Sequence, residues 1–118
     1  GIERNILAVD FGMLQQTDPT GRPSSIARGG KIHLTVEGTG ATDLFEWMTN
    51  SFERKDGSVT FIKRDSDATL KELKFKEAYI VKYTEDFDST GENPLTETFV
   101  LSAKEIEMGN ASHRNEWV

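Results

Sequence analysis

A strict alternation of apolar and polar side chains runs through Lys31–Glu37. Ile32, Leu34 and Val36 share one face, and the side chains between them share the other. A period of two is that of a β-strand, and an apolar face opposite a polar one indicates that one side packs on a core. Looser alternation occurs in four further segments, residues 5–11, 58–64, 70–87 and 95–106. The sequence therefore predicts a mainly β fold, a small antiparallel β-barrel or sandwich.

The longer strands carry two irregularities. Asp56 and Gly57 are a pair typical of tight turns, so we expect a turn before residues 58–64. Glu77 interrupts an apolar face in residues 70–87, which predicts a β-bulge near Glu77 and Ala78. The residues expected on that face are Leu73, Phe75, Tyr79, Val81, Tyr83 and Phe87. In the first strand, the residues expected to share a half-buried face are Leu7, Val9 and Phe11.

One short helix is expected over residues 42–51. Leu44, Trp47 and Met48 follow the i, i+3, i+4 spacing of an amphipathic helix. Asp43 or the threonine before it can cap the start, and a glutamate three residues after Asp43 forms a variant of the capping box. We expect this helix to pack on the sheet.

A long polar segment, residues 15–30, precedes the strand Lys31–Glu37, and we call it the arm. It contributes almost nothing apolar, and its prolines and glycines rule out a regular element. Loops longer than about 12–15 residues without structure of their own are uncommon in compact domains and are usually functional or disordered. We therefore expect the arm to contact another molecule, with Arg22 and Arg28 binding anionic groups or carboxylates of a partner.

Composition narrows the possible functions. The 118 residues fit one domain, residues 1–118. A formal net charge of -6 argues against a nucleic-acid partner, because no basic stripe is available for phosphates. The chain has no cysteine, which excludes disulfides and thiolate metal sites. No apolar run approaches the roughly 20 residues of a membrane span, and the first residues lack the apolar region of a signal peptide.

Candidate catalytic and metal sites are weak. Residues 86–97 nearly match a calcium-binding EF-hand loop, but the flanking segments have strand periodicity, so a hairpin loop is the favoured interpretation. His113 and Glu116 have a helical spacing that could offer two metal ligands, without a third nearby. No nucleophile with partnering acid and base stands out. We expect no enzyme activity, no cofactor and no metal site, and instead an interaction or assembly module.

Several segments, in order, closely resemble one family over essentially the whole chain. They are residues 20–25, 28–30, 31–37, 44–48, 55–57, 59–61, 63–65, 72–73, 78–79 and the ending with Gly109, Asn110, His113, Asn115 and Trp117. The family is the Bacteroidetes branch of the type VI secretion tube protein, the hemolysin-coregulated proteins (Hcp, TssD).

The resemblance implies a small β-barrel with one helix that forms hexameric rings. The rings would stack into a tube inside a contractile sheath, and the tube would leave the cell with a spike at its tip and effectors in its lumen. It would thus be made in the bacterial cytoplasm and exported by the secretion machine, without membrane insertion. Members usually open with a further strand and a tight turn before the strand of residues 5–11, so a neighbouring edge would lack its partner here.

The same resemblance gives the arm contacts with neighbouring subunits and the next ring. The residues expected at these interfaces are Asp18, Arg22, Pro23, Ser24, Ser25, Arg28, Lys31 and His33. The residues expected to anchor the fold are Trp47, Phe61, Tyr79 and Trp117. Four alternatives stay open: a tube protein of another contractile injection system, a monomeric ligand-binding barrel with an interior cavity, a calcium-binding module, and a hydrolase.

Overall fold

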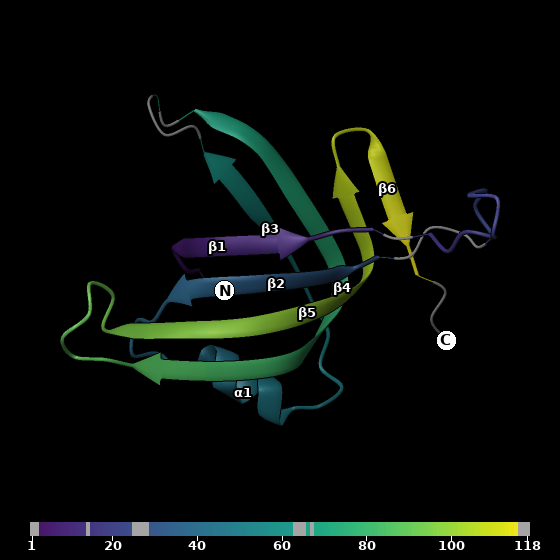
Figure 1. The fold of residues 1–118 in the computed structure, drawn as a ribbon. Coiled ribbons are helices and arrows are strands. Elements are labelled where there is room, and N and C mark those ends of the chain that lie inside the picture. The colour runs from purple at the N-terminus through teal and green to yellow at the C-terminus, as the bar shows by residue number, and fades with distance from the viewer. Residues whose placement is uncertain (1–2, 14, 25–28, 63–65, 67, 116–118) are drawn as a thin grey trace.

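The computed structural model describes residues 3–13, 15–24, 29–62, 66 and 68–115. The described elements, shown in Figure 1, are β1 (Ile6–Phe11), β2 (Lys31–Glu37), α1 (Asp43–Thr49), β3 (Lys55–Ile62), β4 (Thr69–Phe87), β5 (Leu95–Met108) and β6 (Ala111–Arg114). All strand pairs are antiparallel, in the order β1-β2-β5-β4-β3, with β6 added to one end of β5. The mainly β fold with one short helix is confirmed.

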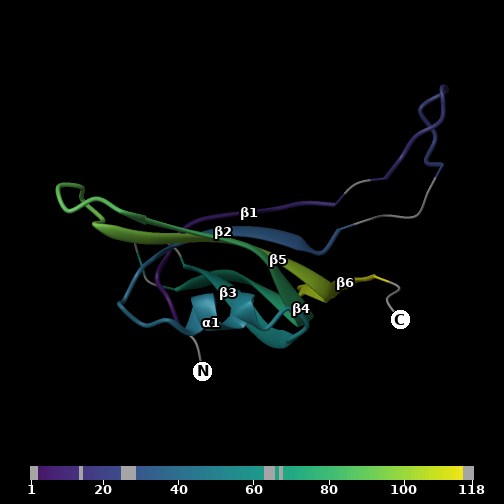
Figure 2. The ribbon, with the colours of Figure 1, turned by 90° about the horizontal axis from the view of Figure 1, so that it is seen from below.

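The sheet curls into a half-barrel. Figure 2 shows β1 and β2 in one layer and β3 and α1 in the other, while β4 and β5 bend between them. β1 and β3 are the two edges of the sheet. The rings of Phe11 and Phe61 meet between these edges at 6.4 Å, and a cavity of about 250 Å³ lies between residues 6–9 and 59–62. The two edges therefore face each other without pairing.

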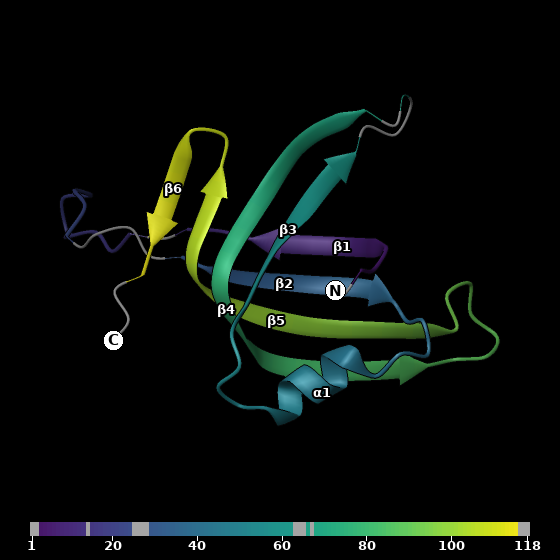
Figure 3. The same cartoon turned by 180° about the vertical axis from the view of Figure 1, so that it is seen from behind.

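The core fills the concave side of this half-barrel. Ile32, Leu34 and Val36 are buried, as their alternation predicts. β5 adds Phe99, Leu101 and Ala103 from the same side, because β2 and β5 pair residue for residue. Helix α1 covers the open side, beside β4, as Figure 3 shows, and it buries Leu44 and Trp47. The stripe spacing of the helix thus predicted its packing face correctly.

The expected single buried face of β4 is wrong beyond Glu77. Leu73 and Phe75 are buried, but Ala78 and Ile80 replace Tyr79 and Val81 in the core. The bulge predicted near Glu77 causes this switch: Glu77 has φ 51, and the pairing with β3 shifts between Lys55 and Gly57. A second shift, in the pairing with β5, falls between Ile80 and Lys82 and brings Tyr83 back against the core. Each extra residue moves the following side chains to the other face.

The turn expected at Asp56 and Gly57 is also wrong, because both residues lie inside β3. The Asp56 carboxylate accepts a hydrogen bond from the Glu77 backbone N–H at 2.8 Å. Gly57 lies under Phe75, and an added Cβ would come within 2.5 Å of that ring. Both turn-forming residues therefore serve the bulge opposite them.

Smaller departures concern the ends of elements. The expected capping box is absent at α1: Thr42 is the N-cap and makes no side-chain capping bond. Its hydroxyl donates to Glu46 instead, at 2.9 Å. Leu7 is 43% exposed rather than half-buried, because the pairing of β1 with β2 shifts between Ile6 and Ala8. β6 was not expected, since its four residues carry no apolar alternation.

Candidate interaction surface

The described outer part of the arm, residues 15–24, lies away from the half-barrel, on the side where β1 ends and β2 begins (Figures 1 and 2). This part folds back on itself. Thr17 and Pro23 form an isolated antiparallel bridge. The Asp18 N–H donates to the Arg22 carbonyl at 2.9 Å, and the Ser24 N–H donates to the Gln16 carbonyl at 2.7 Å. The outer arm is therefore a small hairpin.

Asp18 organises the tip of this hairpin. One carboxylate oxygen accepts from the Thr20 hydroxyl at 2.7 Å, the Thr20 N–H at 2.9 Å and the Arg22 N–H at 3.1 Å. The bond from the Thr20 hydroxyl, followed by that from the Arg22 N–H, lowers the pKa of Asp18 below its usual value. The carboxylate is thus used within the tip, while Arg22, Pro23 and Ser24 present exposed surface.

The remaining residues expected at the interface lie apart from the tip. Lys31 and His33 are exposed on the polar face of β2. His33 stands between Asp10 of β1 and Val100 of β5. The structure therefore brings Asp18, Arg22, Pro23 and Ser24 into one hairpin and places Lys31 and His33 on the adjoining sheet. Ser25 and Arg28 lie outside the described residues.

The base of the arm is held by Asn115. Its side-chain amide donates to the carbonyls of Gly29 and Ala103, both at 2.9 Å. The Ala103 N–H in turn donates to the Gly30 carbonyl at 2.7 Å. Gly30 is buried and has φ +97, a conformation that favours glycine. Asn115 is a residue for which sequence reasoning assigned no role.

The expected fold anchors differ in burial. Trp47 is buried, and Phe61 is partly buried against the core. Tyr79 lies outside the core cluster, where its hydroxyl accepts from Arg54 Nε at 2.8 Å and its ring lies 5.0 Å from the guanidinium carbon. Trp117 lies outside the described residues.

Several large apolar side chains remain exposed on the isolated chain. Phe52 is 84% exposed and Phe87 is 72% exposed. Phe45, Leu70 and Ile62 are also exposed. A single exposed apolar residue is ordinary on a protein surface. Several large exposed ones, and aromatic ones above all, are typical of a surface that a partner protein covers.

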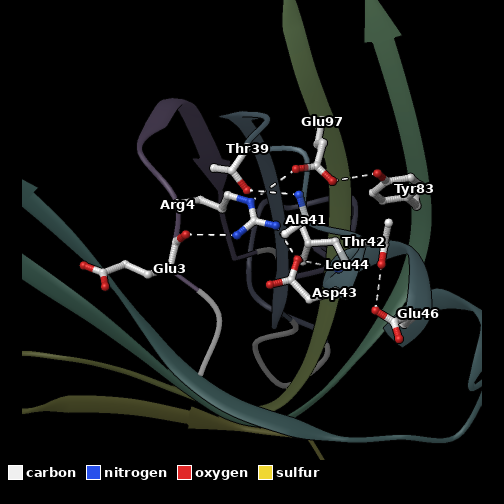
Figure 4. A network of polar contacts seen from close by, with 10 residues as sticks. All are labelled: Glu3, Arg4, Thr39, Ala41, Thr42, Asp43, Leu44, Glu46, Tyr83 and Glu97. Carbon is white, nitrogen blue, oxygen red and sulfur yellow. Dashed lines mark hydrogen bonds and ion pairs between the residues drawn. The ribbon is translucent and has the colours of Figure 1, made fainter.

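A buried polar network, shown in Figure 4, joins the segment before β1 to α1 and the sheet. Arg4 binds Asp43 of α1 with one terminal nitrogen, and its Nε donates to Glu97 of β5 at 3.2 Å. Tyr83 of β4 donates to the other oxygen of Glu97 at 2.6 Å. Sequence reasoning missed this network. One signal was available, because Glu97 has the same parity as the buried Phe99.

This network predicts a loss of stability at alkaline pH. Burial first, and then the hydrogen bond to Glu97, raises the pKa of Tyr83 well above that of a free tyrosine, about 10. The folded chain keeps the Tyr83 hydroxyl proton to a higher pH than the unfolded chain does. The contribution of Tyr83 to the free energy of unfolding is therefore fully present below about pH 10, the pKa of an unfolded tyrosine, and is lost as the pH rises further.

Urea unfolding between pH 8 and pH 11 measures this effect. The decline above pH 10 should be smaller in Tyr83→Phe than in the parent chain. Tyr79→Phe, at the other of the two tyrosines, is the control. Equal declines in Tyr83→Phe and the parent would show that Tyr83 does not contribute.

A second cavity, of about 390 Å³, lies between the helix and the sheet near this network. Trp47 and Leu44 line it from the helix, Phe75 and Phe99 from the sheet, and Arg4 from the chain start. The cavity opens toward the unpaired edges, since its lining includes Ile6 of β1 and residues 55–59 of β3.

Metal-binding geometry is not found among the described residues, where no three His, Asp or Glu side chains gather at one point. The segment that resembled a calcium loop forms the hairpin between β4 and β5, as favoured from the sequence. Asp88 closes its loop by accepting from the hydroxyl and N–H of Thr90 at 2.8 and 3.1 Å. Glu97, the twelfth position, is turned toward Arg4 and Tyr83. The single described helix is too short and too polar to cross a membrane.

Comparisons with known proteins agree with the geometry. A family model described as Hemolysin coregulated protein Hcp (TssD) matches residues 1–118. The structure of Hcp1 from Flavobacterium johnsoniae is similar, with 62% sequence identity and a TM-score of 0.89, and the match covers 95% of this chain and 91% of that one. A comparison with curated proteins gave no match.

More distant structures share the fold alone. A mutant Hcp1 from E. coli EAEC 042 is 18% identical with a TM-score of 0.75, covering 95% of this chain and 79% of that one. A chain of a sheath–tube complex from an extracellular contractile injection system is 20% identical with a TM-score of 0.52, covering 91% of this chain and 78% of that one.

Proposed function

The chain belongs to the hemolysin-coregulated protein (Hcp, TssD) family and is a tube subunit of a type VI secretion system, and we propose that six copies close into a ring and that rings stack into a tube. The observation that carries the proposal is the 62% identity to Hcp1 from Flavobacterium johnsoniae over 95% of the chain. The arm and the exposed aromatic side chains support it, because each offers contact surface beyond the chain's own core.

Ring closure requires two different faces of each subunit to meet. Such a heterologous interface closes when the rotation between neighbours is a whole fraction of a turn, one sixth here. The exposed side chains of Phe52 and Phe87 supply apolar area that a neighbour can cover. The polar face of β2, with Lys31 and His33, supplies a polar contact surface for a neighbouring subunit.

Stacking uses the arm. Asp18 holds the tip hairpin in shape, so that Arg22, Pro23 and Ser24 can meet the next subunit without a large loss of conformational freedom. Ser25 and Arg28 complete this contact in the proposal. Contacts of exposed charges weaken with salt, so stacking should decrease as ionic strength rises.

The tube's partners would be the sheath around it, a spike at its tip and effectors in its lumen. The subunit would be made in the cytoplasm and exported with the tube. In this role the chain acts by assembly, without catalysis, a cofactor or nucleic acid. A tube subunit of another contractile injection system is the second candidate, favoured by the shared fold of the sheath–tube complex.

Solution mass tests the assembly. Sedimentation over a concentration series, with negative-stain imaging of the largest species, should give rings of six subunits, single or stacked. A strict monomer at every concentration would overturn the proposal. It would then favour a ligand-binding half-barrel that uses the cavity beside Trp47.

Arg22→Ala should weaken stacking more than folding. Arg22 is exposed at the arm tip and belongs to no core pattern, so the melting temperature of isolated rings should stay within about 1–2 °C, as for ordinary surface substitutions. The fraction of stacked rings at low salt should fall several-fold. Lys82→Ala, which removes one positive charge from exposed β4, is the matched control. Equal losses of stacking in both variants, or a large drop in melting temperature with Arg22→Ala, would contradict the prediction.

A further inference from the structure

We propose that Asn115 is a positioning residue that fixes the direction of the arm for ring stacking; this inference rests on the proposed function of the arm. Asn115 follows β6 and lies far from the arm tip in sequence. Its side chain nevertheless reaches Gly29, in the part of the arm just before β2 that we call the second leg, and Ala103 of β5.

The hydrogen bonds fix how the amide of Asn115 is turned. Both of its donor hydrogens are used, one on the Gly29 carbonyl and one on the Ala103 carbonyl, each at 2.9 Å. Only an NH₂ group can serve two carbonyl acceptors, so the amide oxygen must face the other way. There it lies 3.2 Å from His113 Nε2, which therefore carries a hydrogen and donates it. The amide therefore makes three hydrogen bonds, two as a donor and one as an acceptor.

The two legs of the arm are packed together at this place. A Cβ added to Gly29 would lie 2.9 Å from Met13 Cγ and 3.2 Å from the Gly12 carbonyl. A Cβ added to Gly30 would lie 2.6 Å from both the Ala103 carbonyl oxygen and the Asn115 amide nitrogen. The close approach therefore requires glycine just before β2, where Gly29 leaves room for Met13 and the Gly12 carbonyl and Gly30 leaves room for the Asn115 amide.

Glycine at the base of the arm creates a need for a restraint. Gly12, Gly29 and Gly30 lack the Cβ that limits backbone rotation, so the arm would pivot about its base without a further contact. The amide of Asn115 joins the Gly29 backbone to β5 directly and limits this pivot. An arm held in one direction loses less conformational entropy when it binds the next ring, which favours assembly.

Asn115→Asp tests the inference with little change in shape. The substitution replaces the donating NH₂ by a carboxylate oxygen that repels the carbonyls of Gly29 and Ala103. Asn93→Asp makes the same chemical change in the exposed loop between β4 and β5 and is the matched control.

Because the chain has no cysteine, Ser24→Cys on the arm and Thr84→Cys on β4 can carry two spin labels. The label-to-label distance distribution is measured with labelled subunits diluted into unlabelled ones, and the fraction of stacked rings is measured on chains that keep Ser24 and Thr84 and carry no label.

We expect Asn115→Asp to broaden the distance distribution and to raise the concentration needed for stacking several-fold, while Asn93→Asp leaves both unchanged. An unchanged distribution in Asn115→Asp would overturn the inference whatever happens to stacking. A broadened distribution with normal stacking would support the hold of Asn115 on the arm but overturn the arm's role in stacking. If Asn115→Asp does not fold, Asn115→Ala is measured in the same way, and its outcomes are interpreted identically.

Discussion

Arg4→Met should lower the free energy of unfolding by about 3–5 kcal/mol, the cost of leaving a buried charge without its partner. Glu97 is only 1% exposed, and Arg4 is its cationic partner at 3.2 Å. Burial of the Arg4 guanidinium lowers its pKa, but the hydrogen bonds to Asp43 and Glu97 outweigh this and raise the pKa above the usual value. After the substitution the Glu97 carboxylate keeps Tyr83 but loses its counter-charge.

Urea unfolding at pH 7 measures this loss, and two further variants test its cause. Arg4→Met combined with Glu97→Gln should recover most of the lost stability, because no buried charge is left. Lys74→Met is the control for an exposed ion pair: Lys74 lies 3.8 Å from Glu72 at the surface, so its loss should cost at most about 1 kcal/mol. A similar small loss in Arg4→Met would mean that water reaches Glu97 and that the network is not a buried one.

The strands differed in how well their sequences predicted them. β2 pairs with β5 without a register shift, and its alternation gave the buried residues correctly. β4 is equally rich in apolar residues, but two bulges move its buried face twice. The bulge at Glu77 was visible as a charge on an apolar face. Its consequence for Tyr79 and Val81 depends on pairing with β3, which the order of residues alone does not contain.

The arm was predictable as a segment because it lacks any apolar period, and its tip hairpin follows from turn-forming residues around Asp18 and Gly21. Its attachment was not predictable. Asn115 binds the carbonyls of Gly29 and Ala103, and backbone acceptors leave no mark in the sequence. The partnership of Arg4 and Glu97 likewise spans 93 residues, so only the unusual parity of Glu97 pointed to it.

Trp47→Ala should destabilise the fold by about 3–5 kcal/mol, the range for buried aromatic residues. Trp47 is 4% exposed, its indole N–H donates to the Glu53 carbonyl at 2.9 Å, and Lys55 Nζ lies 5.7 Å from its ring. Helix α1 has only seven residues, too few to be stable alone, so it depends on this docking. Phe52→Ala, at an 84% exposed site just after the helix, should change the free energy of unfolding of the monomeric chain by less than about 0.5 kcal/mol when both variants are measured below the concentration at which rings form. Thermal and urea unfolding of both variants give the comparison. An unchanged curve for Trp47→Ala would place the indole at a subunit contact rather than in the core, and ring formation by that variant should then fail instead.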